Sequence, residues 1–257
     1  MSQWDVLAIH YGTAERPATD LALEADIHDA PGRIDYFVWL VRGPAGLFLV
    51  DTGFGPAEGA ARGRTLLIHP VEALARLGIA AADITDVILT HLHYDHAGNL
   101  DAFPNARFHI QDREMAYGTG RCMCHARMRK PFAVENIVDA VRMLFAGRLC
   151  FHDGDAVLAD GLSLHLIGGH SRGLQVVRIA RPEGVVVLAS DALHFAAYLK
   201  SSDAFPLFAD YPDVLEGYRK LHALAGPGGL IVPGHDPQVL LDYAPENPAH
   251  PHTLRIA

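Results

Sequence analysis

The sequence predicts a single α/β domain, and three observations support this fold class. Short segments rich in β-branched and apolar residues alternate with amphipathic segments of helical period. The 257 residues are 50% hydrophobic and contain no internal repeat or low-complexity linker, so one domain spanning 1–257 can bury a large core. Several of the strand-like runs end in a histidine or an aspartate, and α/β proteins carry their functional sites beyond the strand ends.

The strand and helix signals follow one another along the whole chain. Strands are expected at 4–11, 35–42, 46–51, 86–90, 106–110, 156–158, 162–167, 174–180, 185–190, 229–232 and 237–241, because these runs are apolar and β-branched. Helices are expected at 69–77, 95–101, 111–117, 133–146 and 212–225. In the first of these helices, Val71, Leu74 and Leu77 recur at helical spacing, and Gly78 is a common C-terminal stop.

A cluster of potential metal ligands follows the strand expected at 86–90. The four ligands lie within six positions: His91, His93, Asp95 and His96. Because Gly98 lets the backbone turn sharply, these side chains can converge instead of alternating between two faces. Imidazole is the commonest zinc ligand, and a neighbouring carboxylate suits zinc, iron or manganese. A solvated turn would explain one histidine, but this spacing predicts a metal site.

Three later residues repeat the same placement at the ends of expected strands. His170, Asp191 and His235 each follow an apolar run, and each would more often be a capping or core residue if it stood alone. Together with the first cluster they exceed what one zinc ion needs, and they suit two ions that share a carboxylate. We assign His91, His93 and His170 to the first metal, Asp95, His96 and His235 to the second, and Asp191 to the bridge. Such a pair can hold hydroxide and polarise a carbonyl or phosphoryl oxygen, which is hydrolytic chemistry.

These motifs resemble the metallo-β-lactamase superfamily. The His-x-His-x-Asp-His motif is matched by the first cluster, Leu49–Gly53 resembles the superfamily's Asp-Thr-Gly turn, and the three later ligands follow in the family's order. Within the superfamily the chain is similar to the N-acyl homoserine lactone lactonases and related small-lactone hydrolases. That likeness rests on Gly169–Gly173, the Ser190-Asp191 pair, the 233–236 ending and an insert between Asp112 and Leu149.

The resemblance implies a four-layer αβ/βα sandwich with a helical insert. It also implies an enzyme that opens a lactone ring by attack of a metal-bridging hydroxide. The cofactors would be two divalent ions, zinc first and iron, manganese or cobalt as alternatives. Asp95 is the expected proton shuttle. His194 stands where many of these lactonases have a tyrosine, so it is a candidate hydrogen-bond donor or general acid, or else only packs near the site. Asp51 and Ser190 are candidates for orienting the ligands, and Tyr94 for lining the pocket.

The segment 112–149 is expected to form a lid that helps to build a homodimer, or else a surface excursion. Its methionines and aromatic residues would suit an apolar substrate tail. Its basic residues would suit an anionic substrate instead: Arg121, Arg127, Arg129 and Lys130. The sequence leaves this choice open.

Composition excludes several other classes. A net charge of -9 disfavours nucleic acid as a partner, and no apolar run is long enough to span a membrane. Without a signal-like N-terminus, a cytoplasmic protein with three reduced cysteines is expected. A bridging Asp191 argues against penicillin-type substrates. Two alternatives stay open, namely hydrolysis of another ester, thioester or phosphoester bond, and a non-catalytic metal-binding or redox-sensing protein.

Overall fold

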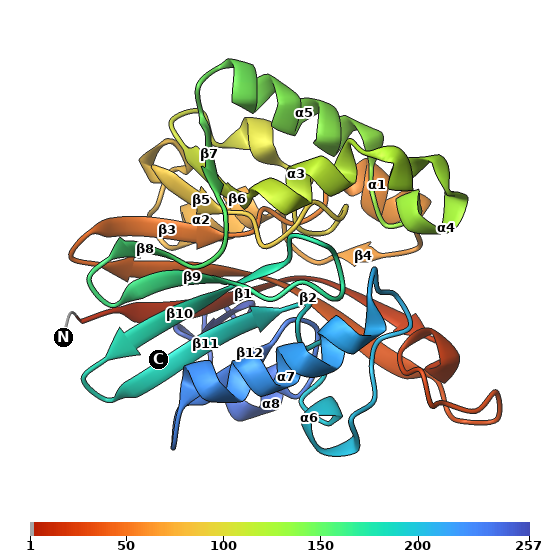
Figure 1. Ribbon diagram of the computed structural model, residues 1–257. Coiled ribbons are helices and arrows are strands. Elements are labelled where there is room, and N and C mark those ends of the chain that lie inside the picture. The colour runs from red at the N-terminus through yellow and green to blue at the C-terminus, as the bar shows by residue number, and fades with distance from the viewer. Residues whose placement is uncertain (1–2) are drawn as a thin grey trace.

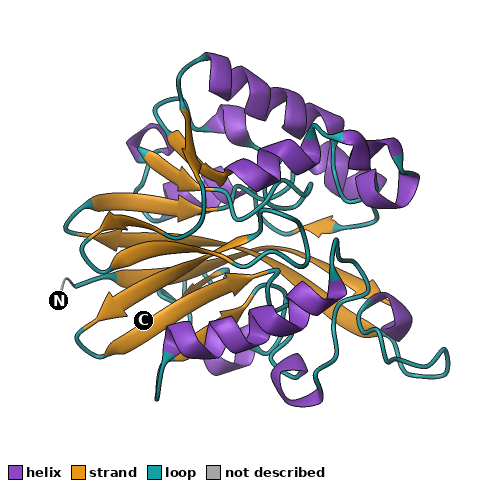
Figure 2. Ribbon diagram, viewed as in Figure 1, coloured by secondary structure: helices purple, strands orange, loops and turns teal. Residues whose placement is uncertain are grey.

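Two β-sheets face each other, and helices cover the outer face of each sheet (Figures 1 and 2). The computed structural model describes residues 3–257. The first sheet has the order β13 (Thr253–Arg255), β1 (Asp5–Arg16), β2 (Gly32–Gly43), β3 (Gly46–Val50), β5 (Asp86–Ile88), β6 (Arg107–Gln111) and β7 (Leu149–His152), with β4 (Thr65–Leu66) paired to β1. The second has the order β12 (Leu230–Pro233), β11 (Gly184–Ser190), β10 (Gln175–Arg181), β9 (Leu162–Leu166) and β8 (Ala156–Ala159).

The helices form the two outer layers (Figure 2). On the side of the first sheet lie α1 (Pro56–Ala61), α2 (Pro70–Arg76), α3 (Asp112–Gly118), α4 (Ala126–Arg129) and α5 (Val134–Phe145). On the side of the second lie α6 (Tyr198–Ser201), α7 (Tyr211–Ala225) and α8 (Val239–Asp242). Short 3-10 helices occupy Ala18–Asp20, Ala81–Asp83, Leu100–Ala102 and Arg121–Cys124. The expected four-layer αβ/βα sandwich is confirmed.

Apolar side chains fill all three gaps between the layers. Along β1, Leu7 and Ile9 pack toward the helices of the first sheet, whereas Val6 and Ala8 pack into the gap between the sheets. A third cluster joins the second sheet to α7 and includes Leu221. Because both faces of the central strands are buried, a slip of one residue in register would change which side chains face each gap.

Parallel pairing brings the strand ends of the predicted site to one edge of the sandwich. In the first sheet, β3, β5, β6 and β7 run parallel, and in the second sheet β11 and β12 run parallel. The carboxyl ends of β5, β11 and β12 are followed by the predicted metal ligands. Such an edge is where α/β proteins bind ligands.

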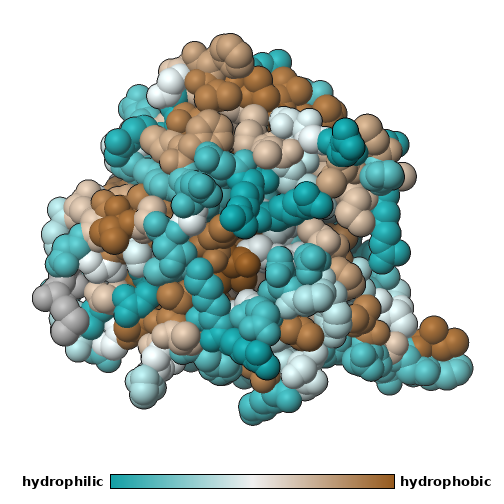
Figure 3. Space-filling view, in the orientation of Figure 1, coloured by the Kyte–Doolittle hydropathy of each residue, from teal (hydrophilic) through white to brown (hydrophobic). Residues whose placement is uncertain are grey.

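The segment expected as a lid has two parts. Because β6 and β7 are parallel, the chain between them is a crossover, and α5 is its helix, with Asn136 and Ala140 buried. Residues 119–133 form a separate excursion. The outer face of α5 exposes Val134, Leu144 and Phe145, and Figure 3 shows apolar residues gathered over this helix. The homodimer stays a prediction.

Two expected elements are wrong. Residues 95–98 form turns in place of a helix, because Gly98 lies against the backbone of Gly53 and the ligand side chains must turn inward. The run expected as a strand at 237–241 is mostly helix α8, which begins after Pro237. Here Asp236 accepts a hydrogen bond from the backbone N–H of Gln238, which favours a helical turn over extended chain. Six further elements were not expected: α1, β4, α4, β7, α6 and β13.

No helix within residues 3–257 combines the length and the apolar character that a membrane span requires.

Candidate metal centre

The structure brings all seven predicted ligands together in buried positions. Three overlapping groups place their ligand atoms within 4.8 Å of one another: His91, His93, His170 and Asp191; Asp95, His96 and His235; and Asp191, His194 and His235. The first two groups match the two sets assigned from the sequence. Among the described residues, no such group includes a cysteine.

Strained turns at the ends of two strands position the site. Asp51 follows β3 with φ of 62°, and Ser190 ends β11 with φ of 46°. A positive φ is unfavourable for residues other than glycine, and such strain clusters at functional sites. Thr90 joins the two turns, because its hydroxyl donates to the Asp51 carboxylate at 2.8 Å and lies 2.9 Å from the Ser190 hydroxyl.

A close approach of two strand ends places His235 beside Asp191. A Cβ added to Gly234 would lie 2.6 Å from the backbone carbonyl of Ser190, which no side chain tolerates. Glycine at this position therefore allows the turn after β12 to pass over the end of β11. The Nε2 atom of His235 consequently lies 3.0 Å from Asp191 Oδ1.

Three of the histidines are oriented through Nδ1. His96 Nδ1 lies 2.7 Å from Asp51 Oδ2, His170 Nδ1 lies 2.8 Å from the Leu207 carbonyl, and His235 Nδ1 lies 2.8 Å from the Asp35 carbonyl. In each case the acceptor fixes the tautomer and directs Nε2 toward the centre. Asp51 thus has the orienting contact that the sequence predicted.

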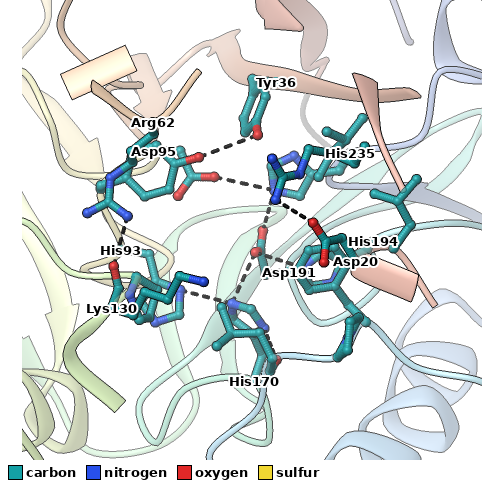
Figure 4. A pocket seen from close by; sticks show the side chains of 18 of the residues that line it. Asp20, Tyr36, Arg62, His93, Asp95, Lys130, His170, Asp191, His194 and His235 are labelled. Carbon is teal, nitrogen blue, oxygen red and sulfur yellow. Dashed lines mark hydrogen bonds and ion pairs between the residues drawn. The ribbon is translucent and has the colours of Figure 1, made fainter. Parts of the chain in front are cut away.

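Asp191 contacts both ligand sets. Its Oδ1 lies 3.1 Å from His96 Nε2, and its Oδ2 lies 3.1 Å from His170 Nε2. In Figure 4 this carboxylate stands at the middle of the pocket floor between His170 and His235. A carboxylate in this position can bridge two cations.

The carboxylates and the imidazoles of the centre stabilise each other's charged forms. Burial raises the pKa of Asp191, but the surrounding imidazoles of His96, His235, His194 and His170 outweigh burial and hold the pKa well below its usual range. Burial disfavours a charge on His96, yet the carboxylates, Asp191 foremost, raise its pKa well above the ordinary value. The site therefore stabilises negative carboxylates only together with positive charge.

Two ligand atoms have no hydrogen-bond partner among residues 3–257. His91 Nε2 and His96 Nε2 are buried without one, although an unpaired buried nitrogen costs about 1 to 3 kcal/mol. These atoms face carboxylate oxygens, so the donor set is nitrogen and oxygen. Divalent zinc, iron, manganese and cobalt accept such ligands. The residues present thus fit a metal centre.

His194 lies on the pocket wall, against the centre. Its Nε2 is 3.1 Å from Asp191 Oδ2, and its ring stacks on Phe205 with centroids 4.1 Å apart. Burial lowers the pKa of His194 to about 3, although the charge of Asp191 acts to raise it. The side chain contacts the bridging carboxylate, and one ligand group includes it. Its role as a proton donor stays a prediction.

Glu114 was missed by the sequence reasoning. Its buried carboxylate accepts hydrogen bonds from the N–H groups of Leu92 and Gly173 and from the hydroxyl of Ser171. It therefore holds the loop of His91 and His93 against the loop of His170. A glutamate in the first turn of a helix carries no sequence signal for such a contact. Tyr11, whose hydroxyl donates to the Asp95 carbonyl at 2.7 Å, was also missed.

A pocket of about 390 Å³ opens above the metal centre. Its floor includes His93, Asp95, His170, Asp191 and His235. Its walls come from both halves of the sandwich and from the excursion at 119–133 (Figure 4). Tyr94 lines the pocket as expected.

A two-sheet sandwich with a buried histidine and aspartate centre at one edge defines a metallo-hydrolase. The chain belongs to the metallo-beta-lactamase superfamily, whose sequence profile matches residues 31–235.

Other proteins resemble this chain in sequence or in structure. A probable metallo-hydrolase of Mycobacterium tuberculosis is 27% identical over 234 residues, which cover 79% of this chain and 74% of the relative. The N-acyl homoserine lactonase AttM of Azorhizobium caulinodans is 30% identical over 179 residues, covering 65% of this chain and 64% of the relative. The solved structure of AidC, a dizinc quorum-quenching lactonase, superposes with a TM-score of 0.73 at 22% identity, covering 91% of this chain and 88% of AidC.

Proposed function

We propose that this protein is a binuclear metal-dependent hydrolase that opens the ring of a small lactone, either an N-acyl homoserine lactone or a related compound. The observation that carries the proposal is the contact of Asp191 with both ligand sets. The first ion would be held by His91, His93 and His170, and the second by Asp95, His96 and His235, with Asp191 shared. Zinc is the proposed metal, and iron, manganese or cobalt would suit the same ligands.

Two divalent ions at such a centre supply a Lewis acid for the carbonyl oxygen and hydroxide at neutral pH. Protein groups complete the reaction. Asp95 lines the pocket with its Oδ2 3.8 Å from His96 Nε2, where it can carry a proton to the leaving alkoxide oxygen. Burial and the charge of Asp95 raise the pKa of Tyr94 to about 12. The Tyr94 hydroxyl therefore stays protonated and can donate a hydrogen bond.

Similarity supports the choice of substrate. AttM is named as an N-acyl homoserine lactonase and AidC as a dizinc quorum-quenching lactonase. The aspartate at position 191 favours lactones over β-lactams on the resemblance described above. A small substrate agrees with the pocket of about 390 Å³, which is at the lower end of ligand-site volumes.

A pH-stat screen tests the proposal directly. Ring opening releases one acid equivalent whatever the side chain, so zinc-loaded and manganese-loaded protein can be assayed on lactones without a chromophore. The same preparations would be offered p-nitrophenyl esters, thioesters, phosphodiesters and nitrocefin, with chelated protein as the control. We expect metal-dependent opening of at least one lactone. Turnover of another bond with no lactone opened would overturn the proposal, and no hydrolysis at all would favour a non-catalytic role.

A further inference from the structure

The pocket above the metal centre is lined by more basic side chains than lactone hydrolysis requires. The five are Arg16, Arg62, Arg64, Arg127 and Lys130. They come from β1, from the chain between α1 and β4, and from the excursion at 119–133. The whole chain has a net charge of -9, so this gathering of cations is opposite in sign to the charge of the protein as a whole.

Two of these cations are neutralised by the protein. Arg16 pairs with Asp20, and Arg62 pairs with Glu58. Arg62 also donates to the carbonyls of Lys130, at 2.8 Å, and Phe132, at 3.1 Å. Arg62 therefore ties the excursion to the rest of the pocket, and Figure 4 shows it beside Lys130.

The other three cations have no carboxylate within 4.0 Å in the part of the chain that the structure describes. Arg64 is held in place by neutral groups, because its Nε donates to the Tyr94 hydroxyl at 3.0 Å and its Nη1 donates to the Arg62 carbonyl. The side chains of Arg127 and Lys130 make no ion pair or hydrogen bond within residues 3–257. Within residues 3–257, three cations of this pocket thus make no direct ion pair.

Much of the remaining wall is apolar. It includes Leu21, Ile34, Phe205, Pro206 and Leu207. A substrate that matches this lining has a compact apolar body and a negative group at the mouth. A long neutral acyl chain would leave the cations without a partner and would partly desolvate them, which is unfavourable.

We propose that the substrate bears a carboxylate separate from the scissile ester, and that Arg64, Arg127 and Lys130 bind this carboxylate. This inference rests on the proposed function and narrows its substrate class to small lactones with an anionic substituent. Guanidinium and ammonium groups form strong charge-assisted hydrogen bonds with carboxylates. The excursion at 119–133 then selects the substrate, because it supplies two of the three cations.

Equilibrium binding tests the inference without catalysis. Benzoate and terephthalate each offer one carboxylate to the metal centre, but only terephthalate has a second for the pocket mouth. On zinc-loaded protein, calorimetry should find terephthalate at least about tenfold tighter than benzoate, and salt should weaken this preference. In the double variant Arg127→Gln/Lys130→Gln, which keeps only Arg64 of the three cations, most of this preference should be lost. Arg121→Gln, in the same segment but outside this pocket, should keep the preference.

A matched pair of lactones tests the same point in turnover. In wild type, kcat/KM for 5-carboxyphthalide should exceed that for its carboxamide by about tenfold or more, mainly through KM. The double variant should lose most of this ratio. Equal affinity for benzoate and terephthalate in the wild type would overturn the inference.

The two proposals fail in different ways. Faster opening of N-hexanoyl homoserine lactone than of the carboxyphthalide would leave the lactonase standing and overturn the anionic substrate. Preferred binding of terephthalate with no lactone opened would leave the carboxylate site standing and overturn the proposed reaction.

Discussion

Carboxylates at the two ends of the sandwich have different partners. At the end away from the metal centre, two acids face an arginine: Asp86 lies 2.7 Å from Arg107, and Asp5 lies 3.1 Å from Arg42. At the other end, Asp51, Asp95 and Asp191 have no lysine or arginine within 4.0 Å among residues 3–257 and face histidines instead.

This difference shows which charges the protein satisfies by itself. A guanidinium is always positive, so the ion pairs at the far end are complete without any ligand. A neutral imidazole directs a lone pair, not a charge, toward its neighbour. The carboxylates at the site end therefore require protons or a metal ion. The strained turns at Asp51 and Ser190 keep these carboxylates in place.

The largest expected effect comes from removing the shared carboxylate. Asp191→Asn should lower lactone turnover by at least about 1,000-fold, because one oxygen of the bridge becomes an amide nitrogen that cannot ligate. Elemental analysis should show less than the full metal content. The exposed Asp101→Asn is the control and should match wild type. Full activity in Asp191→Asn would remove this residue from the centre.

Glu114 should matter almost as much, although it touches no proposed ligand side chain. Glu114→Ala leaves three buried donors without an acceptor, which should lower the free energy of unfolding by about 3 kcal/mol or more. It should also weaken metal affinity by about 10- to 100-fold, as loss of supporting contacts does elsewhere. Chemical denaturation and a metal-competition titration measure the two effects. Glu135→Ala, on the exposed face of α5, should change neither.

Substitution of His194 should lower turnover less, and the metal content of the variant shows whether His194 is a metal ligand or acts in the reaction. His194→Phe keeps an aromatic ring to stack on Phe205 but removes the contact to Asp191. We expect turnover to fall by at least about tenfold with metal content intact. If metal content falls with activity, His194 is a ligand, and unchanged kinetics would exclude it from the mechanism.

The smallest effect should come from the far end. Burial raises the pKa of Asp86, but hydrogen bonds from His109 and Thr85 and the charge of Arg107 outweigh burial and lower it. A lowered pKa in the folded state stabilises the protein above the ordinary value of 3.8, and this contribution is lost as pH falls through the lowered pKa.

Asp86→Asn should therefore cost about 1 kcal/mol at pH 7. The difference between variant and wild type should shrink below pH 4, as followed by urea unfolding across the pH range. Glu72→Gln, which breaks an exposed helix pair with Arg76, should show no such pH dependence. An Asp86→Asn cost that stayed constant down to pH 2 would contradict the pKa argument.

Local patterns made much of the fold and of the centre predictable. The strands at 185–190 and 229–232 were expected because buried strands are continuous apolar runs, and their ends carry Asp191 and His235. The helix expected at 95–101 was wrong. Residues 95–98 form turns, and the side chains of Asp95 and His96 point into the metal centre. The apolar residues Val239 and Leu240 favoured a strand. The structure has a helix there, because the Asp236 carboxylate accepts a hydrogen bond from the Gln238 N–H and stabilises a helical turn.

The sequence by itself determined the ligand types, their spacing and their placement at strand ends, because these depend on residues close together in the chain. Only the tertiary structure decided which distant groups meet. Glu114 reaches Gly173, and Arg64 joins Lys130 at one pocket mouth, through packing between elements far apart in sequence. No local periodicity encodes such contacts, because they arise only when two sheets and a crossover pack on one another.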